Sequence, residues 1–173
     1  MSESSLRSSM THKVSIFLLM LTITILFGAM SWAFMTARGP MVHIPWGFYL
    51  NTALLVVSSF WLHVIWMKQR DASQRPALGG VLIVATLFLI SQGWVWYQLY
   101  ASGQELDGST PRIGFLYVLS GLHALHIVAG MGFLLGVWQR FHKGAARYLE
   151  TAVYFWHFLG VLWLYLLGVL VLN

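Results

Sequence analysis

Residues 14–36 read VSIFLLMLTITILFGAMSWAFMT, a stretch of 23 residues that contains no charged side chain. At about 1.5 Å per residue it is long enough to cross a hydrocarbon core of about 30 Å as an α-helix. Its apolar residues do not alternate with polar ones, as they would in a strand of a membrane β-barrel. A cleaved signal peptide has a shorter apolar core followed by small residues, whereas this stretch ends in large side chains such as Trp32 and Met35. It therefore predicts a retained transmembrane helix.

Four further stretches of the chain have the same character. Each is 22 residues or longer and contains no Asp, Glu, Lys or Arg; they are residues 46–67, 78–99, 113–138 and 151–172. The sequence therefore predicts an all-α fold, an integral membrane bundle of five transmembrane helices that occupies residues 14–173 as one domain. Residues 1–13 are rich in serine and predict a polar tail on the cytoplasmic side.

The composition excludes a water-soluble domain. The 173 residues are 58% hydrophobic and only 9% charged, and the mean hydropathy is +0.72. Soluble domains carry about 25% charged residues, which keep their surface in water. The chain contains no cysteine, so disulfides, thiolate metal sites and cysteine nucleophiles are excluded as well.

The distribution of the basic residues predicts the orientation, because Lys and Arg next to membrane spans stay on the cytoplasmic side. With the N-terminus inside and the C-terminus outside, only Arg38 and Arg112 lie outside. The other eight of the ten basic residues lie inside: Arg7, Lys13, Lys68, Arg70, Arg75, Arg140, Lys143 and Arg147. The net charge of +5 is explained by topology, so we expect a multi-pass protein of a bacterial-type cytoplasmic membrane and no nucleic-acid partner.

Polar side chains within the spans are the first place to look for function, because ionisable groups are costly in lipid. The candidates are four histidines and two amides: His63, His123, His126, His157, Asn51 and Gln92. No carboxylate lies among them, so neither an acid–base pair nor a Ser-His-Asp triad is available, and we expect no catalytic residue. A transporter is disfavoured, because five spans cannot form two equal repeated halves around a midplane site.

The fourth stretch has two distinct faces at about 100° per residue. His123 and His126 share one side with Gly130, whereas Gly121, Gly132 and Gly136 gather on the other side. Two neutral imidazoles without a further ligand make a poor metal site, so we interpret them as hydrogen-bonding residues between helices and expect no metal. The glycines, including the G-x-x-x-G pair at 132 and 136, predict close helix packing.

Glu150 precedes the last stretch, and His157 follows seven residues later on the same face. Their separation of about 10 Å along the axis is too long for direct contact. A chain through Tyr154 or water stays open, and so does a simple role of the carboxylate at the positive end of the helix. His63 and His157 lie at similar depth, so a b-type haem held between two helices is a further alternative, although both have bulky aromatic neighbours.

These motifs resemble those of subunit III of the haem–copper respiratory oxidases. Residues 120–130, S-G-L-H-A-L-H-I-V-A-G, are similar to T-G-x-H-x-x-H-V-x-x-G of that family. Residues 150–165, E-T-A-V-Y-F-W-H-F-L-G-V-L-W-L-Y, are similar to E-x-A-x-x-Y-W-H-F-V-D-x-V-W-L-F. Residues 50–55, L-N-T-A-L-L, with Ser58-Ser59, resemble the L-N-T-x-x-L-L-x-x-S motif, and residues 32–34, W-A-F, resemble part of F-W-A-F.

The sequence also departs from the family pattern at several acidic positions. Ile23 stands where the family has glutamate, and Gly160 stands where it has aspartate. The family motif Q-x-x-E-Y is represented by Gln92-Gly93-Trp94-Val95-Trp96, again without the acid. Of the acidic groups credited with proton delivery in the family, Glu150 remains. Seven helices are usual in the family, and the expected five look like loss of the first two.

The resemblance implies a non-catalytic subunit III of a terminal oxidase, which packs against catalytic subunit I and stabilises it. Haem and copper are then expected in a partner subunit and no cofactor in this chain, and membrane phospholipids are expected partners. The accessory subunit of a quinol oxidase or of a nitric oxide reductase is the alternative within the same wider group. The residues expected to tie the helices together are His123, His126, Glu150, His157, Asn51 and Gln92.

Overall fold

The computed structural model consists of five α-helices and describes residues 3–39, 44–68, 75–104, 110–140 and 146–172. The helices are α1 (Glu3–Thr36), α2 (Gly47–Met67), α3 (Arg75–Ala101), α4 (Pro111–Arg140) and α5 (Ala146–Leu172). All five are long and apolar enough to cross a membrane, and no strand occurs among the described residues. The predicted all-α bundle with five membrane-spanning helices is confirmed.

The helices are longer than the uncharged stretches that predicted them. α1 begins at Glu3, so the polar residues that precede Val14 continue the first helix, and α3 begins at Arg75. α4 begins with Pro111, a position where proline is tolerated because the first turn of a helix needs no amide donor. Charge marks where a span leaves the hydrocarbon, whereas the helix ends only where its backbone hydrogen bonds end.

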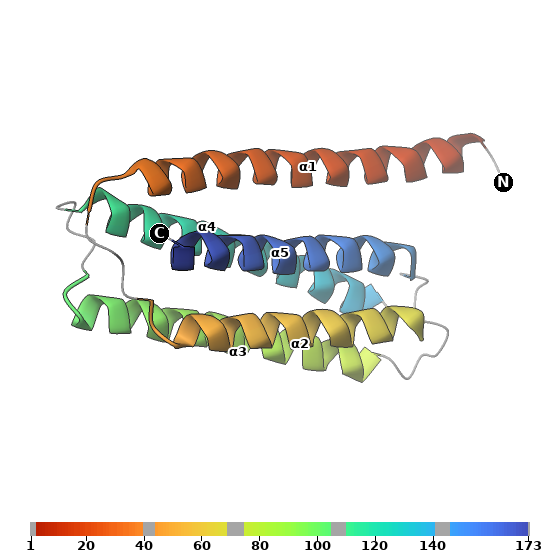
Figure 1. The fold of residues 1–173 in the computed structure, drawn as a ribbon. Helices are drawn as coiled ribbons and strands as arrows, with labels where there is room; N and C mark the ends of the chain where they lie inside the picture. Colours follow the sequence, from red (N-terminus) through yellow and green to blue (C-terminus); the bar gives the residue numbers. More distant parts are fainter. Residues whose placement is uncertain (1–2, 40–43, 69–74, 105–109, 141–145, 173) are drawn as a thin grey trace.

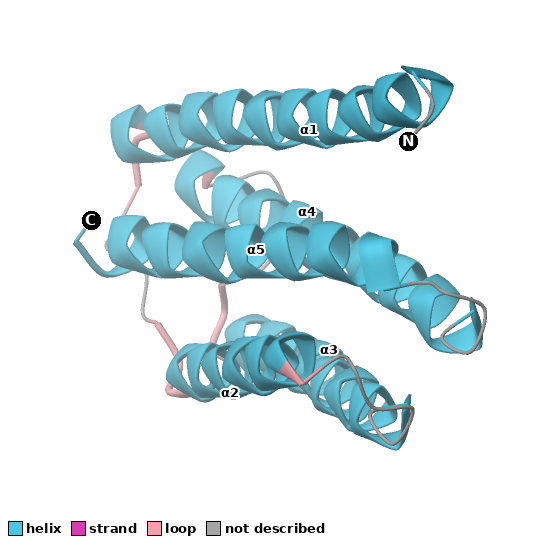
Figure 2. Ribbon diagram, turned by 90° about the vertical axis from the view of Figure 1, so that its right-hand side faces the viewer, coloured by secondary structure: helices cyan, strands magenta, loops and turns pink. Residues whose placement is uncertain are grey.

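The five helices form three layers (Figures 1 and 2). α4 and α5 make up the middle layer; α1 packs against both of them on one side, and α2 and α3 pack against them on the other. The N- and C-termini lie at opposite ends of the bundle (Figure 1), as an odd number of spans requires. The middle layer therefore contacts every other helix.

Large aromatic side chains fill the space between the layers. The largest fully buried side chains include Trp156, Trp163, Phe27, Phe48 and Phe88. The outside is equally apolar: Phe17 is 64% exposed and Trp32 is 68% exposed. An exterior of this kind suits lipid, because a bilayer removes the hydrophobic cost that water would impose on it.

α1 is the most peripheral helix. Only 17% of its span is buried, compared with 39% for α4 and α5. Its buried side chains follow a single stripe at helical spacing: Ile23, Phe27, Ser31 and Phe34. This stripe lies against the middle layer.

Candidate functional site

His123 lies at the centre of the bundle, where all three layers meet. Its side chain is 0% exposed. Its ring centroid lies 6.5 Å from Phe27 of α1, 6.0 Å from Phe88 of α3 and 4.9 Å from Trp163 of α5. Neither ring nitrogen has a hydrogen-bond partner among the described residues. The structure places His123 between helices, where its contacts are made by aromatic rings; the predicted polar tie through His123 stays a prediction.

His126 lies one turn further along α4 and is half-buried. Its Nδ1 lies 2.7 Å from the carbonyl oxygen of Leu122, and because a carbonyl only accepts, Nδ1 carries the proton and donates it. This hydrogen bond stays within α4. Contact with another helix comes from the ring of Phe27, 5.6 Å away.

Asn51 and Gln92 form a direct hydrogen bond between α2 and α3. Asn51 Nδ2 donates to Gln92 Oε1 at 2.7 Å, and both residues are buried. The remaining amide atoms, Asn51 Oδ1 and Gln92 Nε2, have no partner among the described residues. Of the six residues expected to tie the helices together, Asn51 and Gln92 make a hydrogen bond between helices.

Three tryptophans make further hydrogen bonds between helices, and these bonds are not among those predicted from the sequence. Trp156 Nε1 donates to Ser58 Oγ at 3.1 Å, and Trp163 Nε1 donates to Thr52 Oγ1 at 3.0 Å, so both join α5 to α2. Trp96 Nε1 donates to Ser120 Oγ at 3.0 Å and joins α3 to α4. The sequence holds a signal for these bonds: tryptophans and hydroxyl residues occur together within the apolar spans. A buried indole needs an acceptor, and hydroxyls are the nearest ones there.

The glycines of α4 differ in their surroundings. A Cβ at Gly130 would lie 3.2 Å from Leu159 and 3.3 Å from Trp156, so α5 approaches α4 closely there. At Gly121 it would meet only Trp96, at an ordinary 3.9 Å. At Gly132 and Gly136 nothing among the described residues lies within 4 Å. The predicted G-x-x-x-G pair thus has no close neighbour in the described part of this chain.

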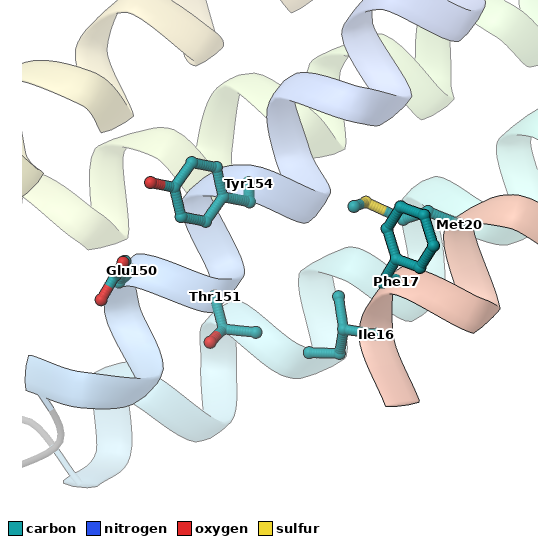
Figure 3. Close-up of a pocket in the computed structure, with 6 residues that line it drawn as sticks. All are labelled: Ile16, Phe17, Met20, Glu150, Thr151 and Tyr154. Atoms are coloured by element: carbon teal, nitrogen blue, oxygen red, sulfur yellow. The ribbon is translucent and has the colours of Figure 1, made fainter. Parts of the chain in front are cut away.

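Glu150 faces α1. Together with Thr151 and Tyr154 of α5 it lines a pocket of about 250 Å³, whose other wall is Ile16, Phe17 and Met20 of α1 (Figure 3). The wall from α1 is apolar, and the polar groups of the pocket come from α5. Glu150 is therefore the carboxylate of a mainly apolar cleft at the edge of the membrane span.

His157 contacts α2 and not the pocket. Its ring centroid lies 5.5 Å from that of His63, and the ring of Trp66 lies 5.4 Å from His63. Tyr154 lies between the two regions, because its ring is 6.4 Å from Trp66 and also lines the pocket with Glu150. The structure thus brings His63 and His157 together and leaves Glu150 apart from them.

The spacing of this pair does not favour a haem. With metal–nitrogen bonds of about 2.0 Å, imidazoles on opposite sides of one iron have centroids about 6.4 Å apart. The observed centroid distance of 5.5 Å is shorter than this, so the two rings as they stand are too close for a haem between them. In the part of the chain that the structure describes, no group of three or more His, Cys, Asp or Glu side chains could hold a metal ion.

Comparison with known proteins identifies a family over most of the chain. The sequence profile of the family described as cytochrome c oxidase subunit III matches residues 40–172, which include α2 to α5; the W-A-F motif of α1 lies outside this range. Cytochrome c oxidase subunit 3 of Pelomedusa subrufa is 30% identical over 126 residues, 68% of this chain and 46% of that protein. Those of Branchiostoma lanceolatum and Anopheles quadrimaculatus are 29% identical with the same coverage. The chain spans about half the length of the curated relatives it matches.

Proposed function

The chain belongs to the cytochrome c oxidase subunit III family, and from this we propose that it is a supporting, non-catalytic subunit of a respiratory terminal oxidase. It packs against the catalytic subunit within the membrane and stabilises it. Haem and copper belong to that partner and not to this chain. Respiratory electron transfer to oxygen is then the reaction that the complex performs.

The observation that carries this proposal is that residues of the family motifs join the helices of this chain to one another. Thr52 and Ser58 of α2 accept hydrogen bonds from Trp163 and Trp156 of α5, and all four lie in the motifs that resemble the family. His123, also a motif residue, is enclosed by aromatic rings. Motif residues that hold helices together support a structural role for the subunit.

The open glycines of α4 indicate a surface for the catalytic subunit. Gly132 and Gly136 have no close neighbour among the described residues, and small residues let a second helix approach closely in lipid, where dispersion contacts drive association. We propose that a helix of the catalytic subunit packs here. The surface differs from Gly130, which is already covered by α5.

The pocket between α1 and α5 supports the proposed contact with phospholipids. Ile16, Phe17 and Met20 offer an acyl chain an apolar wall, and Glu150 and Thr151 offer polar contacts to a headgroup at the same end. The orientation that we propose places this end on the cytoplasmic side, with the N-terminus inside and the C-terminus outside the cytoplasmic membrane.

Extraction of the native membranes in a mild detergent tests the assignment. The full chain, carrying an affinity tag, should bring with it a polypeptide that shows the absorption of haem and contains copper. Tagged Gly132→Leu should recover less of this partner, and tagged Gly28→Leu should recover as much as the unchanged chain, because Gly28 on α1 is also without a close neighbour but faces elsewhere. Recovery of the chain without any metal-containing partner contradicts the proposal, and equal recovery by both variants contradicts the surface.

A further inference from the structure

His63 of α2 and His157 of α5 bring two imidazoles together across the boundary between two layers. Their ring centroids are 5.5 Å apart and their planes are inclined by 54°. We propose that this histidine pair binds a divalent transition-metal ion of the zinc class. The proposal concerns this chain alone and does not rest on its assignment to an oxidase.

The separation of the rings fits one shared ion. With metal–nitrogen bonds of about 2.0 Å, two imidazoles on a tetrahedral ion have centroids about 5.2 Å apart. The observed 5.5 Å lies close to this value, so the ring separation is compatible with one shared ion. The two helices are close beside the pair, because a Cβ at Gly160 of α5 would lie 3.3 Å from the hydroxyl oxygen of Ser59 on α2.

Neither imidazole has a hydrogen-bond partner among the described residues. The ring of His63 contacts Trp66 and His157, and the ring of His157 contacts His63. Both side chains are half-buried, and a polar atom that leaves water without a partner raises the free energy of the folded chain. A bound ion satisfies one lone pair of each ring at once.

The donor set selects the class of ion. Neutral imidazole nitrogens suit zinc, copper and nickel, whereas magnesium and calcium require oxygen ligands such as carboxylates. The carboxylate of Glu150 lies in the pocket beside α1, away from the pair. Two imidazoles without a third protein ligand bind an ion weakly, as argued for His123 and His126, so the expected affinity is low and the remaining coordination positions fall to water. His63 lies four residues, about 6 Å, from the end of α2 at Met67.

The absence of cysteine from the chain permits a selective test. A thiolate bound to Co²⁺ gives a charge-transfer absorption band, and a single introduced cysteine is its only source. We expect this band when Co²⁺ is added to the full-length His63→Cys chain in lipid nanodiscs. Replacing His157 by alanine in the same chain should weaken Co²⁺ binding at least tenfold, because the second ligand is lost.

His126→Cys is the matched control. His126 is also half-buried in a span, and the imidazole one turn away, His123, is fully buried among aromatic rings, so its thiol should give a weaker band. A band of equal strength from His126→Cys, no band from His63→Cys, or a band that survives His157→Ala unchanged would each overturn the proposal.

The unchanged chain provides a second measurement that needs no variant. Cu²⁺ bound at one equivalent should give an electron paramagnetic resonance signal with two equatorial imidazoles. His63→Gln, checked for unchanged helix content, should reduce this number to one and weaken Zn²⁺ binding at least tenfold in competition with a chelator. A signal from the unchanged chain that contains fewer than two imidazoles rules out the site.

Discussion

Trp156 and Trp163 combine apolar packing with directed hydrogen bonds. Both are almost completely buried, and each donates its indole N–H to a hydroxyl of α2. Lipid is as apolar as the bundle core, so burial alone does not specify which faces of two helices meet. A hydrogen bond with one acceptor does specify it, and the two tryptophans fix both the rotation and the height of α5 against α2.

Trp156→Phe should lower the free energy of unfolding, because Ser58 loses its donor. The hydrogen-bond contribution isolated with Ser58→Ala in a double-mutant cycle should be about 0.6 kcal/mol and no more than about 1.7 kcal/mol. Unfolding in mixed micelles measures it. Trp32→Phe, on the exposed face of α1, is the control and should leave stability unchanged. A coupling energy of zero would mean that the bond does not form.

Replacement of His123 separates packing from hydrogen bonding. The ring fills space among Phe27, Phe88 and Trp163, so His123→Ala should cost about 2–4 kcal/mol through the cavity it leaves. His123→Phe keeps a ring there and should cost less than about 1.5 kcal/mol. Equal losses from both substitutions, measured by unfolding, would show that the imidazole nitrogens have partners outside the described residues.

The same position tests the supporting role in the complex. His123→Ala should reduce the yield or operational lifetime of the assembled oxidase, whereas turnover per assembled complex should stay near that of the unchanged complex. Removal of a group that stabilises a transition state typically costs a factor of about 10²–10³ in rate. A turnover loss of that size with assembly intact would contradict a non-catalytic subunit.

At the scale of the helices, the sequence predicted more than the number of spans. It predicted the apolar cores of all five helices, because charge is excluded from lipid, and it found Asn51 and Gln92 as polar groups to be paired. It did not predict which apolar faces are buried: Phe27 is enclosed while Phe17 on the same helix is 64% exposed. Core and lipid select the same residue types, so neighbouring faces of one helix look alike in the sequence.

The positions of the histidines show a second limit of what can be predicted from the sequence. Similar depth leaves open a haem between His63 and His157, and in the structure their ring centroids lie 5.5 Å apart. Glu150 and His157 share a face by spacing, yet Glu150 lines the pocket beside α1 and His157 packs against His63 of α2, because α5 lies between two layers and its surface is divided between them. That division depends on the packing of helices distant in sequence.

The contact between α4 and α5 should tolerate no side chain at Gly130. In Gly130→Leu the new atoms meet Leu159 and Trp156 within 3.3 Å, and overpacking of this kind costs about 1–3 kcal/mol. At Gly132, two residues away, an added Cβ meets nothing within 4 Å, so Gly132→Leu should leave the stability of the isolated chain unchanged. Thermal unfolding of both variants measures the difference; equal stability would mean that α5 does not approach α4 at Gly130.

At the scale of the whole molecule, the five helices place the N- and C-termini at opposite ends of the bundle (Figure 1). α2 ends at Met67 and α3 at Ala101, so Lys68 and Ser102, which directly follow them, lie at opposite ends. Both side chains are exposed. They therefore report separately on the two sides of the membrane.

Cysteine labelling tests the proposed orientation without background, since the chain has no cysteine of its own. In intact cells, a membrane-impermeant maleimide should label Ser102→Cys, and it should label Lys68→Cys only after permeabilisation. The basic residues predict this result because they hold their side of the protein in the cytoplasm. The reverse labelling pattern would invert the topology.

The layering also has a consequence for synthesis. α1 is translated before its main partners, α4 and α5. At about 5–20 residues per second, the first helix waits several seconds in the bilayer before its docking site exists, while α2 and α3 can already associate. α1 therefore faces lipid on every side for that time, which its largely apolar span permits, and its buried stripe is covered when α4 and α5 dock.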